Sequence, residues 1–193
     1  MPSRRTRDDG SSASAPTEPL TASAVTTRAE RQRASGYWLL PAAPTMAQGF
    51  AEWRDDGVAW LRPGVLFGAV SIPASIVHAA VGVSSPEECA EPLAEALQGV
   101  PLFYEPNHDG PDAEYTALVP ASTGLQWRVH PSVAHPYRAL LLVPAPERCE
   151  PGNEPALPWW VVPVDGPGLL CPPDRLTVLV GLGRDASAGE AGA

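Results

Sequence analysis

Apolar positions follow two different spacings along the chain. Met46, Phe50 and Trp53 recur three or four residues apart, which is the spacing of one face of an α-helix. After residue 100, apolar residues gather into short runs rich in β-branched and aromatic side chains, separated by clusters of Asn, Asp, Gly and Pro. Such runs are typical of strands joined by turns. The pattern therefore predicts helices in the first part and a sheet in the second.

The N-terminal part is expected to contain two short helices. Residues 28–35 suit a helix closed by Gly36, and the apolar run 37–40 suits a strand or an extended core segment. Thr45 stands three residues before Gln48, which is a capping-box spacing, and predicts the start of the helix with the apolar face described above.

The stretch 58–73 is the centre of the predicted fold. It reads as two strands, over residues 58–61 and 65–72, about a Pro-Gly turn at residues 62–64. Pro73 suits the first turn of a following helix. A further helix is expected from Ser85, a good N-cap followed by proline.

The second part is expected to form an antiparallel sheet followed by one helix. The last helix should open at Pro172-Pro173-Asp174 and end at Gly181 or Gly183. The sequence thus predicts an α+β fold, a mostly antiparallel sheet with flanking helices. The predicted strands of this part occupy residues 102–104, 115–119, 125–129, 138–143 and 159–164.

The two ends of the chain are expected to lie outside the folded domain. Residues 1–27 are rich in Ser, Thr, Ala, Pro and Arg, with almost no large apolar side chain, so they cannot bury enough surface to offset the entropy of ordering. We predict a disordered tail over 1–27, a single α+β domain over 28–184, and a disordered C-terminus over 185–193.

Composition argues against some classes of function. Of the 193 residues 44% are hydrophobic, which is enough for a core, and the formal net charge is −9. Domains that bind nucleic acid mainly through phosphates usually carry a basic face, which this balance does not favour. All 13 basic residues are Arg, so no lysine is available for Schiff-base chemistry or for a phosphate loop.

The cysteines and the apolar runs indicate a compartment. Cys89, Cys149 and Cys171 are odd in number and far apart, which suits reduced thiols. There is no apolar signal segment and no run of about 20 apolar residues that could span a bilayer. We therefore expect a cytoplasmic protein that is not bound to a membrane.

One loop concentrates side chains with ligand-binding chemistry. Two His-Pro pairs flank it, beside aromatic rings and guanidinium groups that can clamp an anion or stack on a base. An exposed polar hairpin loop without a ligand is the alternative interpretation. The candidate ligand-binding residues are Trp127, Arg128, His130, His135, Tyr137 and Arg138.

No metal or cofactor is expected. The two histidines of this loop would need further ligands, and only His78, His108 or acidic residues could supply them. Gly181-x-Gly183 matches half of a dinucleotide fingerprint, but a helix rather than a strand precedes it, so we reject that interpretation.

Four motifs resemble a known family. They are residues 61–73 (LRPGVLFGAVSIP), 115–120 (YTALVP), 140–144 (LLLVP) and 162–168 (VPVDGPG). In this order they are similar to the actinobacterial proteins related to the N-terminal domain of bifunctional DNA primase/polymerases. The resemblance covers roughly residues 36 to 184. It implies an α+β domain of the primase/polymerase type.

The resemblance also implies where catalytic acids would be. The polymerases of this family hold divalent metal with acids on a central strand, and the matching positions here are Gly68 and Val70. Neither side chain can bind a hard cation. The expectation is a non-catalytic member that binds a nucleotide, a nucleic acid or a protein partner.

Two alternatives belong to other classes of function. One is an active nucleotidyltransferase of the primase-polymerase kind, or a nucleotide hydrolase, that uses Mg²⁺ or Mn²⁺ held by Asp109, Asp112 and Glu114. The other is a protein-interaction adaptor that binds through an edge strand.

Overall fold

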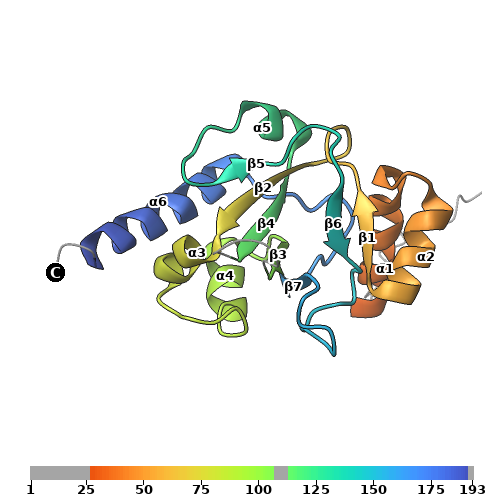
Figure 1. Ribbon diagram of the computed structural model, residues 1–193, viewed down its shortest axis with the longest axis horizontal. Helices are drawn as coiled ribbons and strands as arrows, with labels where there is room; N and C mark the ends of the chain where they lie inside the picture. Colours follow the sequence, from red (N-terminus) through yellow and green to blue (C-terminus); the bar gives the residue numbers. More distant parts are fainter. Residues whose placement is uncertain (1–26, 107–112, 191–193) are drawn as a thin grey trace, which may run out of the picture.

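The computed structural model describes residues 27–106 and 113–190, and its fold is α+β as predicted (Figure 1). The predicted tail 1–27, except Thr27, lies outside the described residues, as do Asp109 and Asp112. The helices are α1 (Arg28–Leu39), α2 (Met46–Asp56), α3 (Ala74–Val81), α4 (Ala90–Ala96), α5 (Ala121–Gln126) and α6 (Pro173–Glu190), with a 3-10 turn at Leu40–Ala42. The strands are β1 (Val58–Leu61), β2 (Gly68–Pro73), β3 (Leu102–Glu105), β4 (Glu114–Val119), β5 (Val133–Ala134), β6 (Leu141–Pro144) and β7 (Trp159–Val162).

The strands form two antiparallel sheets. The larger sheet has the order β5-β2-β4-β3-β7, and the smaller one pairs β1 with β6. The two strands predicted around the Pro-Gly turn are therefore β1 and β2, but they belong to different sheets. Gly64 takes a positive φ of 149° in that turn, which suits glycine.

The larger sheet is covered on both faces, because alternate residues of a strand point to opposite sides. Val70 and Ala117 belong to a core cluster with side chains of α3, α4 and α6. Ala69 and Leu118, their neighbours in the chain, belong to a second cluster with α1, α2, β1 and β6. In Figure 1 these two groups of elements lie on either side of β2, β4 and β3.

The N-terminal helices form as predicted, with two corrections: Thr27, assigned to the disordered tail, caps α1, and Gly36 does not end that helix. Thr27 caps α1 and Thr45 caps α2 through hydrogen bonds to the backbone. Gly36 does not close α1, which continues to Leu39, and residues 37–40 are therefore helical rather than extended. A Cβ at Gly36 would lie in ordinary van der Waals contact, 3.4 Å from Pro146, so this glycine packs beside Pro146 within the helix.

Other predicted boundaries are wrong. No strand forms over residues 125–129, where α5 ends and an irregular segment begins. The helix predicted from Ser85 begins at Ala90. The last helix does not stop at Gly183 but runs to Glu190, so part of the predicted disordered C-terminus is helical. Gly183 is needed for packing, since a Cβ there would collide with the Ile76 carbonyl oxygen at 1.9 Å.

Among the described helices, none combines the length and the apolar character needed to cross a membrane.

Candidate binding groove

The six residues predicted to bind a ligand lie between α5 and β6, but they do not share one surface. Trp127 is 7% exposed and belongs to the core cluster with α3, α4 and α6. Its indole Nε1 donates to Ser132 Oγ over 3.0 Å. Both the ring and its donor are thus already used inside the protein, and the placement of Trp127 on a ligand-facing surface is wrong.

The arginines of this segment have different roles. Arg128 donates to the carbonyl oxygens of Trp127, at 2.6 Å, and of Leu125, at 3.5 Å. Arg138 has a φ of 60°, and its backbone N–H donates to the Pro63 carbonyl oxygen at 2.8 Å. Arg128 therefore holds the end of α5, while Arg138 continues a turn against the Pro-Gly loop. His130 is exposed.

His135 and Tyr137 are brought together, around a very small cavity. It measures about 20 Å³ and is bordered by Gly64, Gly68 and Gly124 among others. The His135 Nε2 atom is buried and has no hydrogen-bond partner among the described residues. A cavity of this size holds about one water molecule, so a nucleotide does not fit there.

Two carboxylates face each other at the end of the larger sheet. Glu114, the first residue of β4, is the register partner of Glu105 on β3. Burial raises the pKa of the Glu105 carboxyl, and the neighbouring Glu114 charge raises it further. Within the described part of the chain, no group of three or more His, Cys, Asp and Glu side chains is placed to hold a metal ion.

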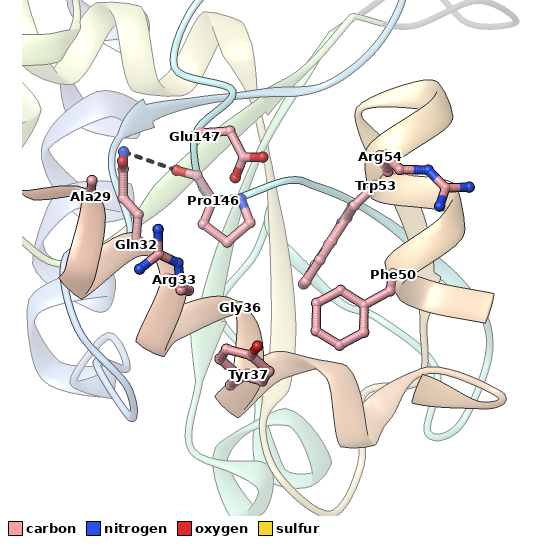
Figure 2. Close-up of a pocket in the computed structure, with 10 residues that line it drawn as sticks. All are labelled: Ala29, Gln32, Arg33, Gly36, Tyr37, Phe50, Trp53, Arg54, Pro146 and Glu147. Atoms are coloured by element: carbon pink, nitrogen blue, oxygen red, sulfur yellow. Dashed lines mark hydrogen bonds between the residues drawn. The ribbon is translucent and has the colours of Figure 1, made fainter. Parts of the chain in front are cut away.

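A cavity of about 550 Å³ opens instead between α1 and α2 (Figure 2). We call it the α1–α2 groove. Its walls come from the two helices, and Pro146, just after β6, lies between them at the back. The lining residues are Ala29, Gln32, Arg33, Gly36, Tyr37, Phe50, Trp53, Arg54, Pro146 and Glu147.

The floor and one wall of the groove are formed by small residues and by side chains that are hydrogen-bonded to the backbone. Gly36 has no side chain, so the α1 backbone lies close to Pro146. Trp53 is only 7% exposed, and its Nε1 donates to the Val143 carbonyl oxygen at 3.0 Å. Gln32 donates to the Pro146 carbonyl oxygen at 3.2 Å and so ties α1 to the floor. These two hydrogen bonds hold the floor and the inner wall beside the open space between the helices.

Two aromatic rings at the groove are exposed to solvent. Tyr37 is 56% exposed and Phe50 is 43% exposed. Their centroids lie 5.5 Å apart in an edge-to-face arrangement, an orientation that aromatic pairs favour. Met46 is also 47% exposed, so only Trp53 of the predicted apolar face of α2 is fully in the core.

The polar rim carries two cations, Arg33 and Arg54. Arg54 is bound to Asp55 through two contacts of 2.8 and 2.9 Å, and in Figure 2 it points away from the groove. Arg33 donates no hydrogen bond to any residue that the structure describes, and it lies on the opposite side beside Gln32. At the start of α1, the Glu30 carboxylate accepts from the Thr27 backbone N–H at 2.7 Å. This end of the helix is therefore already capped.

A second cavity, of about 430 Å³, extends the groove towards the start of α1. It shares Gln32 and Glu147 with the first cavity and is bordered by Arg28 and Cys149. The Arg28 guanidinium donates to Cys149 Sγ at 3.3 Å. Burial nevertheless raises the pKa of this thiol, with Arg28 opposing the shift, so Cys149 has the character of a protonated packing residue.

Sequence reasoning missed this groove. The apolar spacing of α2 was visible, but spacing gives a face and not the neighbour that covers it. A helix end at Gly36, as the sequence predicts, would place Tyr37 in an extended segment rather than on α1.

The chain matches no protein-family model, no curated protein and no solved structure. The resemblance to primase/polymerase domains therefore stays a prediction that rests on the four motifs quoted above.

Proposed function

We propose that this protein is a non-catalytic binding module whose α1–α2 groove takes an extended segment of a partner protein. The observation that carries the proposal is the pair of exposed rings, Tyr37 and Phe50, beside a groove whose floor and inner wall are held by hydrogen bonds. Exposed aromatic side chains around a preformed groove are the usual basis of peptide recognition. A cytoplasmic location is part of the proposal, and the three free thiols support it.

A peptide suits the groove better than a nucleotide does. The two cavities that share Gln32 and Glu147 make an elongated site along α1, whereas a nucleotide is compact. A triphosphate also needs several donors, and the N-terminus of α1 is occupied by Glu30. Two guanidiniums line the first cavity, but Arg54 is paired with Asp55 and the charge of Arg33 already acts on the Glu30 carboxylate, within a chain of net charge −9.

The lining defines the chemistry of the partner segment. Phe50, Tyr37 and Pro146 form an apolar surface that suits a proline or a large aliphatic side chain. Arg33 at the rim suits a carboxylate close to that anchor, because an arginine and a carboxylate form paired hydrogen bonds. We therefore propose a segment with a proline or aliphatic anchor and one carboxylate placed at Arg33, because Glu147 and the net charge of −9 disfavour further negative charge.

Descent from a primase/polymerase domain without its chemistry remains compatible with this proposal. Val70 is fully buried in the core. At Gly68, even a Cβ would lie 3.2 Å from the Gly124 Cα atom and 3.3 Å from the Pro120 carbonyl oxygen. The backbone packing of α5 on β2 thus leaves little room for a carboxylate where the resemblance would put one.

Selection from a random peptide library tests the proposal. Wild-type protein should enrich peptides of the stated chemistry, and Phe50→Ala should lose their binding. Trp60→Ala is a matched control, because Trp60 has the same exposed fraction of 43% but does not line the groove. Enriched peptides that bind Phe50→Ala as well as wild type would contradict the proposal.

A thermal-shift screen with nucleotides, single-stranded DNA, Mg²⁺ and Mn²⁺ tests the competing classes of function, since a ligand stabilises the state that it binds. The proposal expects no shift. Stabilisation by Mn²⁺ with nucleotide that disappears in Glu114→Gln would favour the metal-dependent nucleotidyltransferase instead, with Glu105 and Glu114 as its described carboxylates.

The peptide experiment also tests the edge-strand adaptor. Peptide binding that survives Phe50→Ala but is lost when the edge strand β7 or β5 is altered would favour that adaptor.

A further inference from the structure

A second surface, on α6, has the pattern of a helix that packs against a copy of itself. Arg175, Val178, Leu182 and Asp185 follow one another at intervals of three, four and three residues. Residues at this spacing lie on one face of a helix. The order is symmetric about position 180, with an aliphatic pair in the middle and opposite charges at the two ends.

The structure leaves this face uncovered. Val178 is 60% exposed and Leu182 is 56% exposed. Both border a shallow cavity of about 300 Å³, together with Arg175 and with Ala96 at the end of α4. Val178 and Leu182 thus give the recess an apolar edge that a partner can cover.

The opposite face of α6 already has its partner. Leu176 and Val180 are fully buried in the core, and Gly183 lies against the Ile76 backbone of α3. In Figure 1 the far half of α6 extends away from the rest of the molecule. The Val178 and Leu182 face is therefore held in a fixed position while it remains accessible.

We propose that α6 pairs with α6 of a second copy of this chain, antiparallel and about a twofold axis near position 180. In this arrangement Val178 packs on Leu182 of the other copy, and Leu182 packs on Val178. Arg175 of each copy then faces Asp185 of the other, which gives two ion pairs across the contact. Self-complementarity of this kind is what a twofold interface requires.

The existing contacts of the two charged residues leave them available. Arg175 uses one N–H to bind the Leu97 carbonyl oxygen at 3.2 Å, and a guanidinium has five donors. Asp185 contacts Arg184 at 3.6 Å with both side chains more than half exposed, and such surface pairs contribute little.

Reversing the charges of Arg175 and Asp185 tests the pairing, because only a contact between two copies would be weakened by each single reversal and restored by both together. Within one chain, positions 175 and 185 are about 15 Å apart along the helix, so their side chains cannot meet. Sedimentation equilibrium of the full chain at low ionic strength should show reversible dimerisation over micromolar to millimolar concentrations. Arg175→Glu and Asp185→Arg should each weaken the dimer roughly tenfold. The double variant should recover most of the wild-type association, because both ion pairs are rebuilt with reversed sign.

Two further measurements decide between this pairing and its alternatives. Leu182→Glu should abolish dimerisation while circular dichroism and the melting temperature of the monomer stay close to wild type. Peptide binding in the α1–α2 groove should not change, so failure of either proposal can be recognised separately. A wild-type chain that remains monomeric at millimolar concentration would overturn the α6 pairing, and so would a double variant that associates no better than the single ones.

Discussion

The segment 127–138 and the helix pair α1–α2 contain the same kinds of side chain, aromatic rings beside arginines, and each buries one tryptophan and exposes a tyrosine, but only the second has a large open groove beside its exposed rings. In the first, Trp127 is buried and bonded to Ser132, and Arg128 binds backbone carbonyls. In the second, Tyr37 and Phe50 remain exposed beside an open groove. Residue type alone therefore does not distinguish a ligand surface from a structural segment. The difference is whether the donors and ring faces are already occupied within the protein.

The largest expected effect comes from Trp127. Trp127→Ala removes a buried indole from the core and should lower the free energy of unfolding by about 3–5 kcal/mol. Trp127→Phe keeps most of the apolar volume but leaves the Ser132 hydroxyl without its donor, so a loss of about 1–2 kcal/mol is expected. Denaturation in urea measures both. A Trp127→Ala variant with wild-type stability would show that this side chain is free for a ligand and would reverse the comparison.

For the aromatic residues of the groove, substitution should have a small effect on stability and a large effect on peptide affinity. Phe50→Ala should reduce stability by only about 1 kcal/mol, because much of the ring is already in water and mainly its contact with Tyr37 is lost. The same change should weaken a selected peptide at least roughly tenfold, as expected for an aromatic anchor of an interface. Titration calorimetry measures the affinity, with Trp60→Ala as the control. A large loss of stability without loss of affinity would assign Phe50 to the fold.

The general architecture was predictable because it depends on local signals. The capping threonine Thr45 and the β-branched and aromatic runs that form β4 and β7 act within a few residues of themselves. Thr27 caps α1 by an equally local contact, although it belongs to the predicted disordered tail. The errors occur where a distant contact decides. Gly36 lies within α1 beside Pro146, and Gly183 lies within α6 where the Ile76 backbone leaves no room for a Cβ. The residues next to Gly36 and Gly183 in the sequence do not indicate these contacts with distant residues.

The groove was not predictable for the same reason. Its walls belong to α1 and α2 and its floor to Pro146, about a hundred residues later in the chain. Apolar spacing in α2 correctly indicated a common face for Phe50 and Trp53, but only the tertiary arrangement shows that Trp53 is covered and Phe50 is not. The exposed fraction of a side chain at the edge of the core depends on which other elements pack against it, and the type of the residue does not determine this.

A smaller effect is expected at Arg128. Arg128→Ala removes hydrogen bonds to the carbonyl oxygens of Trp127 and Leu125 from an exposed guanidinium, so stability should fall by about 1 kcal/mol or less. Peptide affinity of the groove should be unchanged. Thermal unfolding and calorimetry on the same preparation measure the two quantities. If Arg128→Ala instead weakens binding of a nucleotide or phosphate at unchanged stability, the original assignment of segment 127–138 as a ligand surface is the correct one.

The smallest expected effect concerns the backbone at Arg138. Its φ of 60° lies in the left-handed region, which costs a residue with a Cβ about 1–2 kcal/mol and costs glycine almost nothing. Glycine also makes the unfolded chain more flexible, which offsets about half of that gain. Arg138→Gly should therefore be more stable than Arg138→Ala by about 0.5–1 kcal/mol, measured by urea denaturation of the two variants side by side.

Left-handed residues other than glycine also occur at functional sites, where strain serves a ligand. For Arg138 the structure offers a simpler cause, because its backbone N–H donates to the Pro63 carbonyl oxygen and holds the segment against the Pro-Gly turn. That bond needs the backbone conformation and not the guanidinium. Both variants should consequently keep the wild-type affinity for every ligand found. Equal stability of the two variants would mean that strain is absent at this position, and loss of a ligand in both would mean that the side chain, rather than the turn, is what the protein uses there.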